Sequence, residues 1–128
     1  AMAQDSAELV FTMDKEYELK KDASPVTLDL IIGDKGQSPD LNVKLNSKKL
    51  LTNHDKSIKN LLIDTNDNLN TKVLRITGNV TDTSEDSNKI EVVIRVKGGK
   101  NNLEKKFSVT VEESGEEVDL SFIIRFTN

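Results

Sequence analysis

The sequence predicts an all-β fold, an antiparallel β-sandwich of about seven or eight strands. Apolar and polar residues alternate with a period of two in at least five segments, which is typical of strands with one buried face. Short stretches rich in Gly, Asn, Asp and Ser separate these segments, as turns between strands require. The length of 128 residues suits one hydrophobic core. Short strands at regular spacing therefore indicate two packed sheets.

The expected strands follow one another along the whole chain. Residues 9–19 supply one strand or two, because the alternation is less regular there. Residues 118–126 form the clearest strand, with five apolar side chains on one face. The other expected strands contain residues 26–32, 41–45, 74–76, 90–96 and 107–111.

Polar turns join these strands. The stretch GDKGQSPD (residues 33–40) contains glycines, which accept a positive φ, and a proline, which cannot continue a strand ladder. KGGKNN (97–102) is typical of a hairpin connection. TDTSEDSN (81–88) and EESGEE (112–117) are expected to be two further polar connections.

One segment departs from the period of two. Ile58, Leu61 and Leu62 are spaced at i, i+3 and i+4, the spacing of one helix face. Asp55 and Ser57 are both suitable N-cap residues. We therefore expect one short helix near residues 55–63, which would cross between the two sheets.

The chain is expected to form one domain. Residues 1–6, AMAQDS, are interpreted as the remnant of an expression vector or a disordered N-terminal tail, because the charged and apolar regions of a signal peptide are missing. Residues 7–128 would then form the single β-sandwich domain.

Composition argues against several classes of function. The 18 basic and 22 acidic residues are interleaved, and there are three arginines and no tryptophan, so a nucleic-acid-binding domain is not expected. The chain has no cysteine, which excludes disulfides and thiolate metal ligands. No stretch approaches the roughly 18 apolar residues of a spanning helix, so the domain is not expected to be embedded in a membrane.

The stretch DTNDNLNTK, residues 64–72, contains two aspartates and three asparagines. Asp64, Asn66 and Asn68 match the first three ligand positions of an EF-hand calcium loop. A leucine stands where that loop needs glycine, and an arginine where it needs the bidentate glutamate. Because Asn and Asp also favour turns, a structural turn between two strands is the preferred interpretation.

A calcium site of another kind stays open. Acidic loops from separate parts of a sandwich can share an ion, if both loops lie at one end. The loop that contains Asp82, Glu85 and Asp86 would then join the Asn-rich stretch. The candidate calcium ligands are Asp64, Asn66, Asp67, Asp82 and Asp86. The preferred alternative is two solvated acidic loops.

No catalytic apparatus is recognisable. His54 is the only histidine, and no G-x-S-x-G elbow surrounds a serine. Neither glycine-rich phosphate-binding motif occurs. Tyr17 is the only aromatic residue outside the expected core, which argues against a glycosidase and against an aromatic sugar platform. We therefore expect no enzyme, and no cofactor apart from the calcium alternative.

Three apolar residues fall on the outward faces of their strands: Ile31, Val93 and Ile123. We expect the crossover helix or a loop to cover them. A contact with a neighbouring domain or subunit is the alternative.

In its strand pattern the chain resembles the broad class of immunoglobulin-like sandwiches of bacterial surface proteins, although the Cys, Trp, Cys core signature is missing. The resemblance implies a non-enzymatic structural or interaction module, such as a stalk, adhesin or assembly domain, at the cell surface or secreted. Its partner would be another protein or a neighbouring domain of the same polypeptide. The alternative is a calcium-dependent domain that binds a ligand, for example a carbohydrate. Some such sandwiches cross-link a lysine to an asparagine, and this question also stays open.

Overall fold

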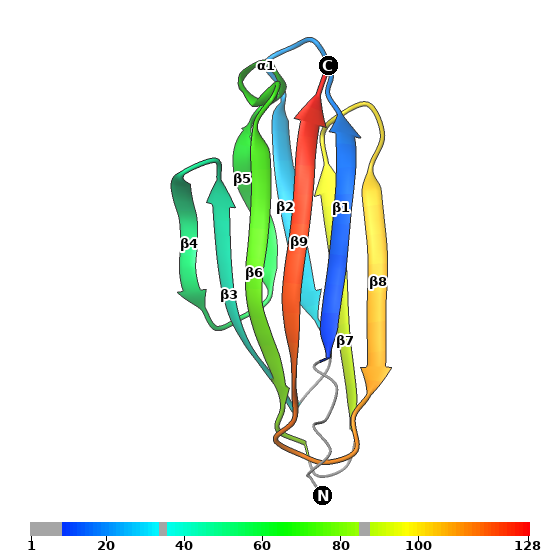
Figure 1. Ribbon diagram of the computed structural model, residues 1–128. Coiled ribbons are helices and arrows are strands. Elements are labelled where there is room, and N and C mark those ends of the chain that lie inside the picture. The colour runs from blue at the N-terminus through cyan, green and yellow to red at the C-terminus, as the bar shows by residue number, and fades with distance from the viewer. Residues whose placement is uncertain (1–8, 34–35, 85–87) are drawn as a thin grey trace, which may run out of the picture.

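The computed structural model describes residues 9–33, 36–84 and 88–128, and it confirms the all-β class and the sandwich (Figure 1). The predicted tail, residues 1–6, lies outside the described residues. The described part of the chain forms nine strands, one more than the upper expectation, and one short helix. In chain order the elements are β1 (Val10–Glu18), β2 (Pro25–Ile32), β3 (Gln37–Leu45), β4 (Lys48–His54), β5 (Ile58–Thr65), α1 (Asn66–Leu69), β6 (Val73–Asp82), β7 (Lys89–Lys97), β8 (Leu103–Thr110) and β9 (Glu117–Thr127).

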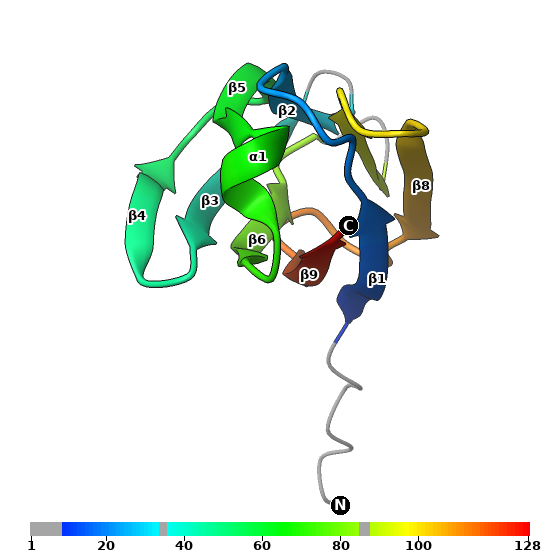
Figure 2. The ribbon, with the colours of Figure 1, turned by 90° about the horizontal axis from the view of Figure 1, so that it is seen from above.

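Two sheets pack face to face (Figure 2). The five-stranded sheet has the order β1-β9-β6-β3-β4, and the four-stranded sheet has the order β5-β2-β7-β8. The strand pairs are antiparallel except for β1 and β9, which run parallel. The edge strands β1 and β8 lie on one side of the sandwich, and β4 and β5 lie on the opposite side.

The alternating residues of the central strands form the core, as the sequence predicts. Every second residue of β7 and β9 is buried, from Ile90 to Val96 and from Val118 to Phe126. Phe107 of β8 stacks on Phe122 of β9 and on Phe11 of β1, with ring centroids 5.0 and 5.4 Å apart. These three rings join the two sheets near the β1 and β8 edges.

The prediction of a helix near residues 55–63 is wrong. Most of this segment is strand β5, and the helix α1 follows it at one end of the sandwich. β5 pairs with β2 through two register shifts, and Asn60 has a φ of 52°. Bulges of this kind insert extra residues into a strand, so its apolar residues lose the period of two and imitate helical spacing. No helix in the described part of the chain is long and apolar enough to cross a membrane.

Strand β4 was not expected from the sequence. Val43 of β3 pairs with Leu51, and Lys44 pairs with Lys49, so Leu50 is an extra residue. The bulge places two leucines in succession and hides the alternation.

The outward apolar residues are not covered by a helix, because α1 lies at the end of the sandwich (Figure 1). Ile31, Val93 and Ile123 are nevertheless half-buried. Val93 pairs with Ile31 on one side and with Lys106 on the other. The aliphatic stems of long charged side chains can cover apolar surface in this way.

Candidate functional site

The Asn-rich stretch of residues 64–72 forms the end of β5, helix α1 and the connection to β6. Asn66, the first residue of α1, is fully buried. Asn66 Oδ1 accepts a hydrogen bond of 2.8 Å from the Lys20 N–H. Asn66 Nδ2 donates to Ser24 O at 2.9 Å, to Ser24 Oγ at 3.1 Å and to Gly98 O at 3.0 Å. One side-chain amide therefore ties the loop before β2 and the turn after β7 to helix α1.

The two aspartates of this stretch have local surroundings. Asp64 Oδ1 accepts hydrogen bonds from Asn68 Nδ2 at 3.0 Å and from the Thr65 N–H at 2.7 Å. Both hydrogen bonds lower the pKa of Asp64, and the bond from Asn68 has the larger effect. Asp67 is exposed, and its backbone N–H donates to Asp22 O at 3.0 Å. The contacts agree with a structural connection between two strands.

Asp82 ends strand β6 and is buried, with an exposed fraction of 1%. Its Oδ1 accepts a hydrogen bond of 3.0 Å from the Ser84 N–H, and its backbone N–H donates to Glu116 O at 2.9 Å. Its Oδ2 has no hydrogen-bond partner among the described residues. The remaining candidate ligand, Asp86, lies outside the described residues, as does Glu85.

Of the candidate calcium ligands that the structure describes, Asp82 lies far from the other three. Asp64, Asn66 and Asp67 lie before the start of β6, and Asp82 lies at its far end (Figure 1). A strand of ten residues is about 33 Å long, too far for one ion to be shared. Within the described ranges, no group of three or more His, Cys, Asp or Glu side chains is placed to hold a metal ion. Calcium binding by one loop alone stays the alternative to a structural turn.

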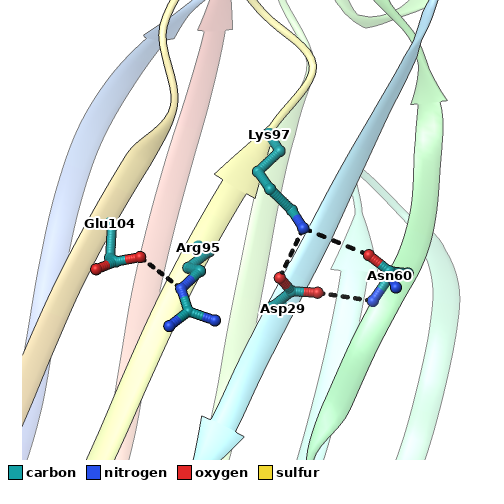
Figure 3. A network of polar contacts seen from close by, with 5 residues as sticks. All are labelled: Asp29, Asn60, Arg95, Lys97 and Glu104. Atoms are coloured by element: carbon teal, nitrogen blue, oxygen red, sulfur yellow. Dashed lines mark hydrogen bonds and ion pairs between the residues drawn. The ribbon is translucent and has the colours of Figure 1, made fainter.

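A polar network lies on the outer face of the four-stranded sheet, with Asp29 of β2 at its centre (Figure 3). Asp29 Oδ2 is 3.0 Å from Lys97 Nζ of β7, and Asp29 Oδ1 accepts a hydrogen bond of 2.7 Å from the Asn60 N–H of β5. At the bulge in β5, the Asn60 N–H therefore donates to the side-chain carboxylate of Asp29, and Asn60 has no paired residue in β2. Arg95 of β7 and Glu104 of β8 form a neighbouring ion pair.

The surroundings of Asp29 keep it charged. Burial acts to raise the pKa of Asp29, but the hydrogen bonds from the Asn60 N–H and the Lys97 ammonium outweigh it. The pKa of Asp29 is therefore lowered. The charged Asp29 carboxylate joins β2 to β5 and to β7, so its role is structural.

The same network bears on the open question of a cross-link between lysine and asparagine. Lys97 Nζ lies 3.4 Å from Asn60 Oδ1, and Asp29 contacts both residues (Figure 3). Amide formation would require a neutral Lys97 amine to attack Asn60 Cγ and release ammonia, assisted by a protonated acid. The charged Asp29 instead forms an ion pair with Lys97, whose side chain is 38% exposed. The arrangement favours an ion pair over a covalent bond.

His54 also has a structural environment. It ends β4, and its Nε2 lies 3.4 Å from Ser57 O. The Ser57 hydroxyl accepts a hydrogen bond of 2.9 Å from the Ile32 N–H. The residues around His54 therefore join β4 to the end of β2, and no helix cap forms at Asp55.

Sequence reasoning missed the role of Tyr17. Its hydroxyl accepts a hydrogen bond of 2.9 Å from the Gly99 N–H, and its ring meets Phe126 edge-on at 6.0 Å. Tyr17 is buried, although the sequence placed it outside the core. Its place two residues from Leu19, in the same alternating run, was the available signal.

The architecture of a β-sandwich is the level of classification that the structure supports. The resemblance to immunoglobulin-like modules stays a prediction that rests on the strand pattern. Comparisons with models of protein families, with curated proteins and with solved structures found no match for this chain.

Proposed function

We propose that this chain is a non-enzymatic structural module that carries tension along its length, as a stalk, adhesin or assembly domain of a bacterial surface or secreted protein does. One observation carries the proposal: the first and last strands are parallel neighbours. Val10 of β1 pairs with Asp119 of β9, and the register continues without a shift to Glu18 and Thr127.

This pairing determines how the module responds to force. β1 begins at one end of the sandwich, and β9 ends at the other (Figure 1). Tension on the two ends of the chain would slide β1 along β9. The hydrogen bonds of a parallel pair run across the strands, so they resist such sliding together and do not open one after another.

Contacts beyond the ladder strengthen the same pair. The Asp119 N–H donates to Leu9 O at 2.9 Å, and the Leu19 N–H donates to Thr127 O at 2.7 Å. Arg125 of β9 bonds both carboxylate oxygens of Asp14 of β1, at 2.9 and 3.0 Å. The pair is therefore joined at both ends and near its middle.

Polar side chains at one end of the sandwich hold its loops together, as a force-bearing module requires. Asn66 and Tyr17 bond backbone groups of other loops, which holds the connections at the end where β9 finishes. A module that transmits force needs such closed ends more than an open cleft. The surface location comes from the resemblance in strand pattern, and fractionation of the cells that make the protein tests it.

Single-molecule force spectroscopy tests the mechanical role. In one protein, handles are attached to the two ends of the chain, so that β1 and β9 are sheared. In a matched control, the second handle is attached to a cysteine introduced at the exposed Ser114, before β9, in a chain without other cysteines. The control peels β1 from β9 from one end. We expect a clearly higher unfolding force in the first geometry, and equal forces in the two geometries would refute the proposal.

A further inference from the structure

Each edge strand carries an ionisable residue at a core-facing position. Residues directly opposite each other in a ladder share one face of the sheet, and each of these four residues pairs with a buried apolar residue. The pairs are Lys15 with Ile124, Lys105 with Ile94, Lys48 with Leu45, and Asp64 with Val26. Inward-pointing charges of this kind protect free strand edges from pairing with other chains.

The two open sides of the sandwich differ in charge. On the side of β4 and β5, the core-facing residues are Lys48 and Asp64, and Lys48 contributes to the lowered pKa of Asp64. On the side of β1 and β8, both residues are lysines. No carboxylate within the described ranges forms an ion pair with Lys15 or Lys105. The Lys48 and Asp64 side shows that an edge can be protected by one positive and one negative residue. The two positive charges of Lys15 and Lys105 are therefore not explained by edge protection alone.

Lys15 and Lys105 line one cavity of about 340 Å³, together with the hydroxyl-bearing residues Thr12 and Ser121. Asp14 also lines it, but both of its oxygens are bonded by Arg125, which offsets the negative charge. The two lysines come from different sheets, Lys15 from β1 and Lys105 from β8, and both line this opening. Lys105 Nζ lies over the Phe107 ring, 5.3 Å from its centre, so the aromatic face is its neighbour on this side.

We propose that this cavity binds a small oxyanion, the phosphate or sulfate group of a ligand. Two ammonium groups supply charge-assisted hydrogen bonds, which are the stronger kind, and hydroxyl groups supply further donors. An anion between the lysines would also relieve their mutual repulsion. The site is independent of the tension-bearing role, because the anion would contact side chains of β1, β8 and β9 and leave the backbone hydrogen bonds between β1 and β9 in place.

An NMR titration of the whole isotope-labelled chain with inorganic phosphate, at constant ionic strength, tests this site. We expect saturable shifts at residues 12–15, 105, 121 and 123. Lys15→Gln and Lys105→Gln should each weaken phosphate binding about tenfold, the effect of losing one charge-assisted hydrogen bond. The matched control is Lys59→Gln, at an exposed lysine of β5 on the opposite side, which should bind as the unaltered protein does.

Two further arms make the result decisive. The double variant Lys15→Arg with Lys105→Arg keeps both positive charges and should retain phosphate binding. A phosphate monoester should shift the same residues if the phosphate group can be part of a larger ligand. Circular dichroism melts confirm that each variant is folded. Shifts that grow in proportion to phosphate without saturation, or equal affinity in the Lys→Gln variants and the control, would overturn the proposal.

Discussion

Replacement of Asn66 by alanine should destabilise the sandwich by removing one buried amide that serves three chain segments. The Lys20 N–H, the Ser24 carbonyl and the Gly98 carbonyl each lose a partner. At about 1 kcal/mol for each backbone group, the free energy of unfolding should fall by about 3 kcal/mol. The unfolding entropy of a chain of 128 residues is about 0.27 kcal/mol/K, so the midpoint should fall by about 11 °C.

The matched control is Asn68→Ala in the same short helix. Asn68 is exposed and bonds only the Asp64 carboxylate, so its loss should change the free energy of unfolding by less than about 0.5 kcal/mol, or about 2 °C. Thermal melts and urea titrations followed by circular dichroism measure both variants. Equal losses in the two variants would show that Asn66 does not act as the anchor described above.

Three further predictions concern the pH dependence of stability, the cross-link between lysine and asparagine, and calcium. Because the pKa of Asp29 is lowered on folding, its contribution to stability is present above the ordinary carboxyl range and is lost as the pH falls below about 4. Urea titrations should therefore show a steeper loss of stability towards acid for the unaltered protein than for Asp29→Asn, and parallel pH profiles would contradict this. The intact mass should equal that of the full sequence, since Lys97 forms an ion pair with Asp29 beside Asn60, and a mass short by one ammonia would contradict this. Thermal melts in excess chelator and in millimolar calcium should superimpose, since the Asn66 amide is already engaged, whereas a rise of several degrees in calcium would establish binding by one of the acidic loops.

The central strands could be predicted from the sequence because burial on one face imposes a period of two. This holds for β2, β3, β7 and β9, where the apolar residues of the pattern are the buried ones. The edges are harder, because one lysine at a core-facing position interrupts the pattern. Lys15 made the first strand look like one strand or two, and Lys105 delayed the expected start of β8 from Leu103 to Phe107.

The role of the Asn-rich stretch could not be read from its composition. Asparagine is equally suitable for a calcium loop, for a turn and for a buried anchor. The choice for Asn66 depends on partners 46, 42 and 32 residues away, which no local pattern contains. The separation of Asp64 from Asp82 likewise depends on the length and direction of β6.

The place of β9 in the five-stranded sheet has a consequence for biosynthesis. β9 lies between β1 and β6, so β1 has no sheet neighbour until the last strand has left the ribosome. Joining them brings together residues as far apart as Asp14 and Arg125, which are 111 positions apart in the chain. Closing so long a loop costs entropy and slows folding. The nascent chain is therefore expected to complete this sheet only once β9 has emerged, in one late step that unites β1 and β9.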